Sequence, residues 1–360
     1  MKLLATLMLF ALSAAAQWQP ATPESQGMSS KKLDALRDGL AARTTKTFLV
    51  IRHDRLVYEW YAPDWNKDKP HGTASLAKQL VGSTSLILAL GDRKLSLDDT
   101  VCKYVPQWKD DPLKKIVTIK QLATHTSGLE DSVVAPGSGK PHQEQTGWQG
   151  EFWKQLDPPK DPFTLSRDMA RVVRPPGTTF PPGDDTGYSN PGYAMLSYAV
   201  AAAYRGTPYT DLRVLLRDRL MRPIGAADEE WSIGYKKTYQ VDGLPLVATW
   251  GGGNYTARAV ARVGCLMLHD GKWDGKQVLS AEWVRHAKKT GDCGWWLHGI
   301  PKRLPQDAFL GAGAGMEVLI VVPSLDLVVV RNGRDLSDES DWGGLATWLV
   351  NPLMDSIVKP

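Results

Sequence analysis

The strand-like segments of this chain lie near its two ends, and the long stretch between them is mostly helical in pattern. Thr47 to Arg52 and Arg55 to Tyr61 alternate as a hairpin, and Val318 to Val322 with Leu327 to Arg331 form a second one. Strands this far apart in sequence can share a core by pairing into one sheet. We therefore expect an α+β fold, with one antiparallel sheet built from both ends of the chain, flanked by helices, beside a mostly helical region.

Between these ends the sequence predicts a series of helices. Apolar residues recur three and four positions apart, the spacing that places them on one helix face. The expected helices are Ser29–Leu40, Ser75–Leu90, Thr118–Thr124, Phe163–Val172, Pro191–Tyr204, Thr210–Leu220, Ala257–His269, Ala281–Ala287 and Trp342–Val350. The sequence shows no repeats and no linker, so we expect a single domain over residues 17–360. Ser132 to Pro162 is the least regular segment, which is equally typical of an active-site lid and of surface decoration.

The N-terminus has the composition of an export signal. Lys2 precedes a short apolar run, and Ala14 to Ala16 offer a small-residue cleavage site before Gln17. The run is too short to cross a bilayer comfortably, and no other apolar stretch reaches about 18 residues. We expect residues 1–16 to be a signal peptide, and the protein to be exported, periplasmic or secreted, without stable membrane insertion.

Charge and residue types exclude several classes of protein. The net charge is +4 with a pI near 8.8, and no basic run indicates binding to nucleic acid. The histidines show no close metal-binding spacing and no C-x-x-C occurs, so neither a metal nor an organic cofactor is expected. The three cysteines allow at most one disulfide, and the sequence decides neither that pairing nor an oligomeric state. They are Cys102, Cys265 and Cys293.

Ser75 and Lys78 are the strongest candidates for a reactive site. Residues three apart share a helix face, so the lysine amine can reach the serine oxygen and act as its base. In the first turn of a helix, the dipole also favours a developing anion on that oxygen. A second S-x-x-K pair, Ser29 and Lys32, lies in a polar helix start. Only Ser75 is followed by an apolar run, Leu80 to Leu90, that is typical of a buried helix.

Tyr188 and Asn190 are the second candidate pair. In an extended segment, residues two apart point the same way, so the phenol and the amide would project together. A phenol can relay a proton to a leaving group, and an amide can orient a lysine or a substrate carbonyl. The alternative is structural: the tyrosine covers the edge of the core, and Asn190 caps the helix that begins near Pro191.

A glycine-rich run over residues 311–315 precedes the last predicted hairpin. Glycine lets a backbone approach a ligand closely, so main-chain N–H groups of Gly313, Ala314 and Gly315 are candidates for binding a substrate oxygen. The alternative is a plain loop that enters a strand.

His125, two residues before Ser127, invites comparison with a serine–histidine triad. No G-x-S-x-G motif occurs, which argues against an α/β-hydrolase. Ile119 to Gly128 instead reads as a short helix ending at a glycine, where a histidine interacts favourably with the dipole. We therefore expect a structural role for His125.

Taken in order, these elements resemble the serine β-lactamase-like superfamily, with its S-x-x-K, Y-x-N and K-T-G-like motifs. The closer resemblance is to the class C β-lactamase-related serine hydrolases, a branch of esterases, D-aminopeptidases and amide hydrolases. Thr118 to Leu129 is similar to its T-I-x-x-L-L-T-H-T-S-G-L signature, with Ala123 replacing one leucine. The resemblance runs from about Thr22 to Leu349. Further matches are Pro175-Pro176-Gly177-Thr178, Trp283, Gly294-Trp295-Trp296 and Val321-Val322-Pro323.

The resemblance implies a β-lactamase/transpeptidase-like catalytic domain whose active site lies between the helical region and the sheet. It also implies an acyl-enzyme mechanism with Ser75 as the nucleophile. Lys78 and Tyr188 would be its acid–base groups, and the sequence leaves open which of them is the main base. Asn190 would hold Lys78 or the substrate. Main-chain N–H groups of Ser75 and Ala314 would form the oxyanion hole.

Two departures from the family bear on the substrate. The loop before Tyr188 carries the extra residues Pro181 to Asp185, and the third motif, aligned with residues 311–313, has neither a lysine nor a hydroxyl. Such groups help to bind a substrate carboxylate, so we expect a small neutral ester or amide, with esters preferred. The alternatives are a β-lactamase or D-alanyl peptidase, with Arg331 or Arg334 supplying the charge, and a non-catalytic penicillin-binding-like receptor.

Overall fold

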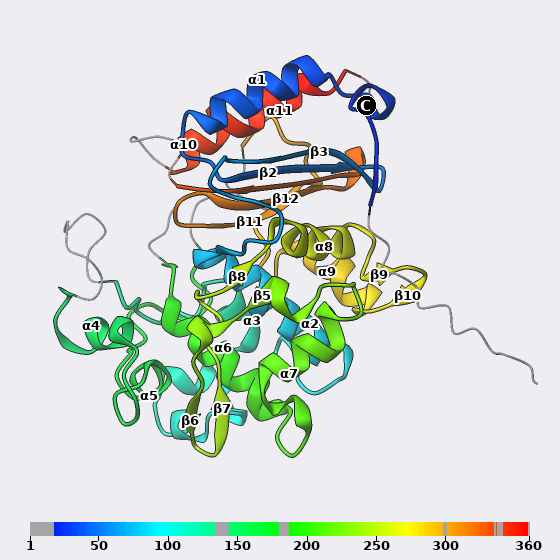
Figure 1. Ribbon diagram of the computed structural model, residues 1–360. Helices are drawn as coiled ribbons and strands as arrows, with labels where there is room; N and C mark the ends of the chain where they lie inside the picture. Colours follow the sequence, from blue (N-terminus) through cyan, green and yellow to red (C-terminus); the bar gives the residue numbers. More distant parts are fainter. Residues whose placement is uncertain are drawn as a thin grey trace, which may run out of the picture.

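The computed structural model describes residues 18–133, 144–179, 187–297, 301–334, 336 and 341–358 of the 360-residue chain. The predicted signal peptide and the extra residues 181–185 lie outside the described residues. Figure 1 shows a sheet flanked by helices, stacked on a mostly helical region. The α+β architecture expected from the strand patterns is confirmed.

The main sheet joins the two ends of the chain. Its strand order is β1-β3-β2-β13-β12-β11. β13 pairs with β2 in antiparallel register, from Leu327 opposite Arg52 to Asn332 opposite Thr47, so both predicted hairpins are confirmed and share one sheet. β1 differs from the expected pattern because it pairs with β3 in parallel. The strands are β1 (Gln19–Pro20), β2 (Thr47–Arg52), β3 (Arg55–Tyr61), β11 (Phe309–Gly313), β12 (Glu317–Val322) and β13 (Leu327–Asn332).

The central strands are buried on both faces, which explains their continuous apolar runs. In β12, Leu319 and Val321 pack with the helical region, whereas Val318 and Ile320 pack with the helices on the other face. Successive side chains of a strand point to opposite faces, so an unbroken apolar run fits a sheet that is covered on both sides. The covering helices are α1 (Ser30–Ala41) and α11 (Asn351–Ser356) on the outer face and α8 (Ala257–Leu268) on the inner face (Figure 1).

The helical region contains the long buried helix that starts at the Ser75–Lys78 motif. The helical stretch Ala74–Gly91 has a mean hydropathy of 1.2 and the length to cross a membrane, yet 83 % of it is buried inside the protein. Burial on nearly all sides explains the apolar run that predicted this helix. Its second half is α2 (Thr84–Gly91). Further helices of this region are α3 (Ile119–Ala123), α4 (Gly147–Lys154), α5 (Pro162–Asp168), α6 (Asn190–Ala203), α7 (Leu212–Leu216) and α9 (Ala281–Thr290). The short helix α10 (Asp341–Gly344) lies instead with α1 and α11 on the outer face of the sheet (Figure 1).

Short strands connect the helices of this region. They are β4 (His71–Gly72), β5 (Trp231–Ser232) and β8 (Asn254–Tyr255) in one small sheet, β6 (Tyr239–Val241) with β7 (Leu244–Leu246), and β9 (Lys272–Trp273) with β10 (Lys276–Gln277). β4 leads directly into the Ser75 turn, so this small sheet fixes the entry to the motif.

Helix boundaries differ from the sequence-based expectations where a local contact ends the helix. α5 ends at Asp168 because the chain beyond it forms a bridge between Val172 and Leu129. α7 begins at Leu212 rather than at residue 210 because the side chain of Asp211 caps it. The irregular segment Ser132 to Pro162 holds a helix, α4, that its polar composition did not predict.

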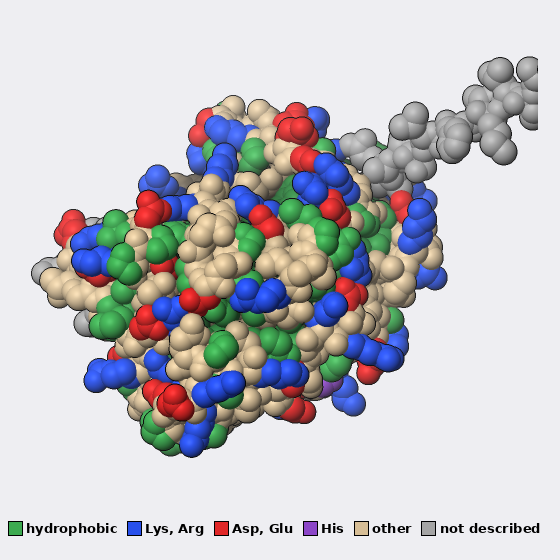
Figure 2. Space-filling view, turned by 90° about the horizontal axis from the view of Figure 1, so that it is seen from below, with side chains coloured by type: hydrophobic (Ala, Val, Ile, Leu, Met, Phe, Trp, Pro, Cys, Tyr) green, Lys and Arg blue, Asp and Glu red, His purple; other side chains and the backbone are tan. Residues whose placement is uncertain are grey.

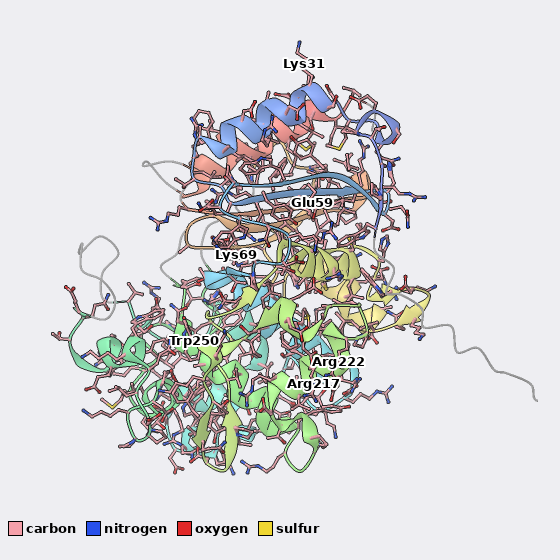
Figure 3. The ribbon with its side chains drawn as sticks, in the orientation of Figure 1. Lys31, Glu59, Lys69, Arg217, Arg222 and Trp250 are labelled. Atoms are coloured by element: carbon pink, nitrogen blue, oxygen red, sulfur yellow. The ribbon has the colours of Figure 1, made fainter. Side chains whose placement is uncertain are left out.

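Charged side chains of both signs are interspersed over the face shown in Figure 2. Beyond α7, Arg217 pairs with Asp218 and Arg222 pairs with Asp228, and both arginines are labelled in Figure 3. Each of these surface pairs contributes little to stability. Their effect is to balance charge locally, so this part of the described surface lacks the single-sign stripe typical of nucleic-acid binding.

All three cysteines are free thiols in the described chain, so no disulfide joins them. Cys265 and Cys293 are buried, and Cys102 is partly buried. Burial raises the pKa of the Cys293 thiol to about 12, which keeps it protonated and unreactive.

Candidate active site

Ser75 lies in the turn that opens the buried helix. Ala74–Leu76 form a 3₁₀ turn, and Lys78–Ser83 continue it with π-helical hydrogen bonding. Ala74 has a φ of +44°, a left-handed conformation that costs a non-glycine residue about 1–2 kcal/mol. Such strain and such π-helical turns are concentrated at functional sites. Ser29, in the second S-x-x-K pair, only caps α1.

Lys78 is fully buried, with 0 % of its surface exposed. Its Nζ lies 3.3 Å from Ser75 Oγ, 2.8 Å from Asn190 Oδ1 and 2.8 Å from the carbonyl oxygen of Trp250. Burial lowers the pKa of the amine to about 7, and the negative charge of Asp131 acts against that shift. An amine with this pKa is partly neutral at pH 7, which is the form that can accept a proton.

Tyr188 reaches the same serine from a distant part of the chain. Its hydroxyl donates to Ser75 Oγ over 2.8 Å. Lys78 Nζ lies 4.6 Å from the centre of the tyrosine ring, within the range in which an aromatic face attracts a cation. Ser75 Oγ is thus contacted by both an amine and a phenol, the groups that the sequence predicted around it.

The segment that carries Tyr188 and Asn190 is extended up to the start of α6. Ser189 between them has φ −145° and ψ 112°, so the side chains on either side of it project the same way, as expected. Ser189 Oγ accepts from Gly192 N–H at 3.0 Å and thereby caps α6. The alternative reading of Asn190 as the cap is wrong, because Ser189 takes that position and leaves the Asn190 amide for Lys78.

His125 contacts the extended segment that carries Tyr188 and Ser189. Its Nδ1 accepts from Ser189 N–H at 3.1 Å, and its ring stacks on Tyr188 with 4.4 Å between the ring centres. Burial and the nearby charge of Lys78 lower the pKa of His125 to about 3, so the ring is neutral at pH 7. A neutral ring stacked on the phenol fits the structural role expected for this histidine.

The helix expected over Ile119 to Gly128 is shorter than predicted. α3 ends at Ala123, and His125 beyond it has a φ of +59°. His125 therefore does not lie on the helix near its C-terminal dipole. The left-handed turn is what directs its ring toward Tyr188.

The end of β11 packs directly against the Ser75 turn. A Cβ on Gly313 would lie 2.4 Å from the carbonyl oxygen of Thr73 and 2.8 Å from Ser75 N. No side chain fits at this position, so the strand backbone itself lies against the nucleophile. The predicted binding residue Ala314 follows directly and is exposed.

The other two glycines of the run have different surroundings. A Cβ on Gly311 would lie 2.7 Å from the side chain of Leu76, so this position also admits no side chain without rearrangement. Gly315 lies in the turn to β12, and its carbonyl accepts from Arg331 at 2.6 Å. The structure therefore brings Gly313 against Ser75, whereas the Gly315 carbonyl is bound to Arg331. The glycine-rich run thus places main-chain atoms, rather than side chains, next to the Ser75 turn.

Arg331 is 0 % exposed, and its side chain hydrogen-bonds the turn between β11 and β12. Its guanidinium donates to the carbonyls of Gly315 and Met316, at 2.6 and 2.9 Å, and to Thr45 Oγ1 at 3.0 Å. A cation buried in this way is not placed to bind a substrate carboxylate. Arg334, the other arginine considered for that role, is exposed at the surface.

Two participants in the site were not predicted from the sequence. The Trp250 carbonyl binds Lys78, and Figure 3 shows this residue in the helical region. A carbonyl ligand leaves no signature in a sequence, because every residue carries one. Asp131 accepts from Asn190 N–H at 2.8 Å and from Asn190 Nδ2 at 3.0 Å. The sequence indicated Asp131 only through its position, two residues after the family signature that spans Thr118 to Leu129.

Tyr235 forms an aromatic surface beside the Trp250 segment. It is 41 % exposed and adopts a left-handed conformation with φ +56°. Its hydroxyl lies 2.6 Å from where a Cβ on Gly251 would be, so the ring packs closely on that backbone. A partly exposed aromatic ring therefore lies beside the backbone segment whose Trp250 carbonyl binds Lys78.

Within the described ranges, no group of three or more His, Cys, Asp or Glu side chains is arranged to hold a metal ion. The groups that contact Ser75 Oγ are an amine and a phenol, and the Asn190 amide contacts that amine. Their chemistry is that of proton transfer and hydrogen bonding.

Comparison with known proteins identifies the family. The Beta-lactamase family matches residues 33–339, most of the chain. The protein therefore belongs to the Beta-lactamase family and is a hydrolase of β-lactamase fold. The expected resemblance to the serine β-lactamase-like superfamily is confirmed.

Individual relatives of this protein differ in the activities that they are named for. The chain is 25 % identical to the 6-aminohexanoate-dimer hydrolase of Paenarthrobacter ureafaciens over 292 residues, 79 % of this chain and 68 % of that protein. A putative 6-aminohexanoate-dimer hydrolase from Bacillus anthracis superimposes with a TM-score of 0.70 at 20 % identity, covering 95 % of this chain and 87 % of that one. A family VIII carboxylesterase superimposes with a TM-score of 0.62 at 14 % identity, covering 91 % and 99 %. The solved structures show the shared β-lactamase/transpeptidase-like fold.

Proposed function

We propose that this protein is an exported serine hydrolase that cleaves carboxylic esters or amides through an acyl-enzyme, with neutral esters preferred. The observation that carries the proposal is the environment of one oxygen atom. Ser75 Oγ lies 2.8 Å from the Tyr188 hydroxyl and 3.3 Å from Lys78 Nζ. A serine hydroxyl is a poor nucleophile unless a base is this close.

In the acylation step, neutral Lys78 accepts the proton of Ser75 as the serine oxygen attacks the substrate carbonyl. The lowered pKa of Lys78, about 7, suits an amine that gains and loses a proton near neutral pH. Tyr188 gives its proton to the departing alkoxide or amine and recovers it from protonated Lys78. Water then attacks the acyl-enzyme, with the same groups acting in reverse order, and restores free Ser75.

The negative charge that develops on the carbonyl oxygen needs donors fixed in advance. We assign this role to the main-chain N–H groups of Ser75 and Ala314. Gly313 allows it, because its lack of a side chain lets β11 approach Ser75 N. One such donor typically contributes about 3 kcal/mol to the transition state.

The preference for neutral substrates follows because β11 carries no cationic or hydroxyl side chain that could bind a substrate carboxylate. Both residue 311 and residue 313 are glycines, position 313 admits no side chain, and Arg331 is bound to main-chain carbonyls. A substrate carboxylate would lose water at this strand without gaining a charged partner, which costs binding energy. The relative named as a 6-aminohexanoate-dimer hydrolase keeps linear amides within the proposed substrate class. Because that dimer carries a carboxylate, we expect it to be a poorer substrate of this protein than a neutral ester.

Hydrolysis assays test the proposal on four proteins: wild type, Ser75→Ala, Lys78→Ala and the control Ser29→Ala. The substrates are a p-nitrophenyl ester, nitrocefin and the 6-aminohexanoate dimer. We expect turnover of the ester by wild type and Ser29→Ala, and none by Ser75→Ala. Nitrocefin as the best substrate would move the enzyme to the β-lactam-hydrolysing class. Failure of the wild type on every substrate would favour a non-catalytic receptor.

We also propose that the protein is exported after cleavage near Ala16, on the basis of the N-terminal sequence. N-terminal sequencing of protein from the periplasm or medium should give a chain that begins near Gln17. A chain that retains Met1 and remains inside the cell would contradict export.

A further inference from the structure

The Asn190 carboxamide lies between two charged groups. On one side, its Oδ1 accepts from Lys78 Nζ at 2.8 Å. On the other side, its Nδ2 donates to Asp131 Oδ1 at 3.0 Å, and its main-chain N–H donates to the same oxygen at 2.8 Å. The amide therefore bridges an amine and a carboxylate through hydrogen bonds of ordinary length.

This arrangement allows only one orientation of the amide. If the carboxamide rotated by half a turn, its NH₂ group would face the amine and its oxygen would face the Asp131 carboxylate. The amide oxygen would then face the carboxylate oxygen, which pairs two acceptors, and the NH₂ group would face the protonated form of the amine, which pairs two donors. Asp131 accordingly selects the orientation in which the Asn190 oxygen faces Lys78.

We propose that Asp131 is a positioning residue for the hydrolase, which locks the Asn190 amide toward Lys78 and sets the charge of the amine across that amide. The inference rests on the proposed function, in which Lys78 must be neutral to act as a base. A negative charge two hydrogen bonds away favours the protonated amine and so counteracts the burial that neutralises it. Asp131 would thus keep Lys78 able to both accept and return a proton.

The charges around Lys78 support this reading. Asp131 is the charged group that raises the Lys78 pKa against the effect of burial. Burial in turn raises the pKa of Asp131, while the hydrogen bonds from Asn190 and the charge of Lys78 act to lower it. Among the described residues, the other titratable groups that face the amine are the neutral ring of His125 and the phenols of Tyr188 and Tyr193.

The effect of charge is separable from that of orientation with two substitutions. Asp131→Asn retains an oxygen that can accept both Asn190 bonds but removes the negative charge. Asp131→Ala removes the charge and the acceptor together. Glu130→Gln is the matched control, because this neighbouring carboxylate binds the main-chain N–H of Arg171 instead.

The decisive experiment titrates the Lys78 amine by NMR in full-length protein with ¹³C-labelled lysine, assigned with Lys78→Ala. We expect the Lys78 pKa to be about one unit lower in Asp131→Asn than in wild type, the lower end of what a neighbouring charge produces. Glu130→Gln should match the wild type. An unchanged Lys78 pKa in Asp131→Asn overturns the inference. The titration needs no turnover, so an inactive wild type would contradict the proposed function without affecting this test.

Ester hydrolysis then gives a second readout in the same proteins. The acid limb of kcat/KM should move to lower pH in Asp131→Asn, together with the Lys78 pKa. Asp131→Ala should lose about tenfold to a hundredfold in kcat, the scale of a misplaced catalytic group, and Asp131→Asn should recover most of that loss at its own optimum. Equal kcat in Asp131→Ala and wild type would show that Asp131 is not needed to orient the Asn190 amide, and would overturn this part of the inference.

Discussion

Replacing Gly313 with alanine should damage both stability and turnover, because this glycine is where β11 touches the nucleophile turn. The added Cβ would lie 2.4 Å from the Thr73 carbonyl oxygen, 2.8 Å from Ser75 N and 2.9 Å from Leu76 N. To reach an ordinary contact of 3.4 Å, strand and turn must separate by about 1 Å. All three contacted atoms are main-chain atoms, so no flexible side chain can move aside.

Two magnitudes follow from that displacement. Overpacking of this kind typically lowers the free energy of unfolding by about 1–3 kcal/mol. A shift of about 1 Å at the nucleophile typically lowers kcat by about a hundredfold. Urea denaturation measures the first effect, and ester hydrolysis at saturating substrate measures the second.

Gly39→Ala is the matched control, because it makes the same chemical change in the interior of α1. A Cβ there meets no atom within 4 Å, and alanine is the better helix former. We expect wild-type turnover and a gain of about 0.5–1 kcal/mol in stability. Wild-type turnover and stability in Gly313→Ala would refute the close approach of β11 to Ser75.

Three further predictions concern the chemistry. Because Lys78 acts when neutral and its pKa is lowered to about 7, kcat/KM should be half-maximal near pH 7, nearly full about one pH unit above it and fall about tenfold per pH unit from about one unit below it; a profile that is flat down to pH 5 would contradict Lys78 as the base. Lys78→Ala and Tyr188→Phe should each lower kcat by at least about a hundredfold in ester hydrolysis, and near wild-type activity of Tyr188→Phe would reduce the tyrosine to a packing role. The ratio of kcat/KM for a p-nitrophenyl ester to that for nitrocefin should be at least about 100, or 2.7 kcal/mol, and equal values would show that a cation elsewhere binds the carboxylate.

Much of the fold was accessible from the sequence because its strands and buried helix are strongly patterned. Thr47 to Arg52 and Arg55 to Tyr61 are strands with the predicted bounds. β11 was missed as a strand because Gly311 and Gly313 have low strand propensity, and tertiary packing against the Ser75 turn requires them there. Close approach to another backbone overrides local propensity, and a sequence does not show which backbone approaches.

The site was predicted to the extent that its groups belong to spaced motifs. Ser75 and Lys78 share one helical turn, and Tyr188 and Asn190 share one extended segment, so spacing alone indicated each pair. Asp131 is different, because its partner lies 59 residues away and only folding brings them together. The same limit applies to Trp250, whose contribution is a main-chain carbonyl.

The central claim, that Ser75 is an activated nucleophile, is tested most directly by covalent labelling with a fluorophosphonate followed by peptide mass spectrometry. We predict one adduct, on the peptide that contains Ser75, in wild type and in Ser29→Ala. Folded Ser75→Ala should carry no adduct. Labelling of Ser75→Ala to the same extent, or an unlabelled wild type that is folded, would contradict the account.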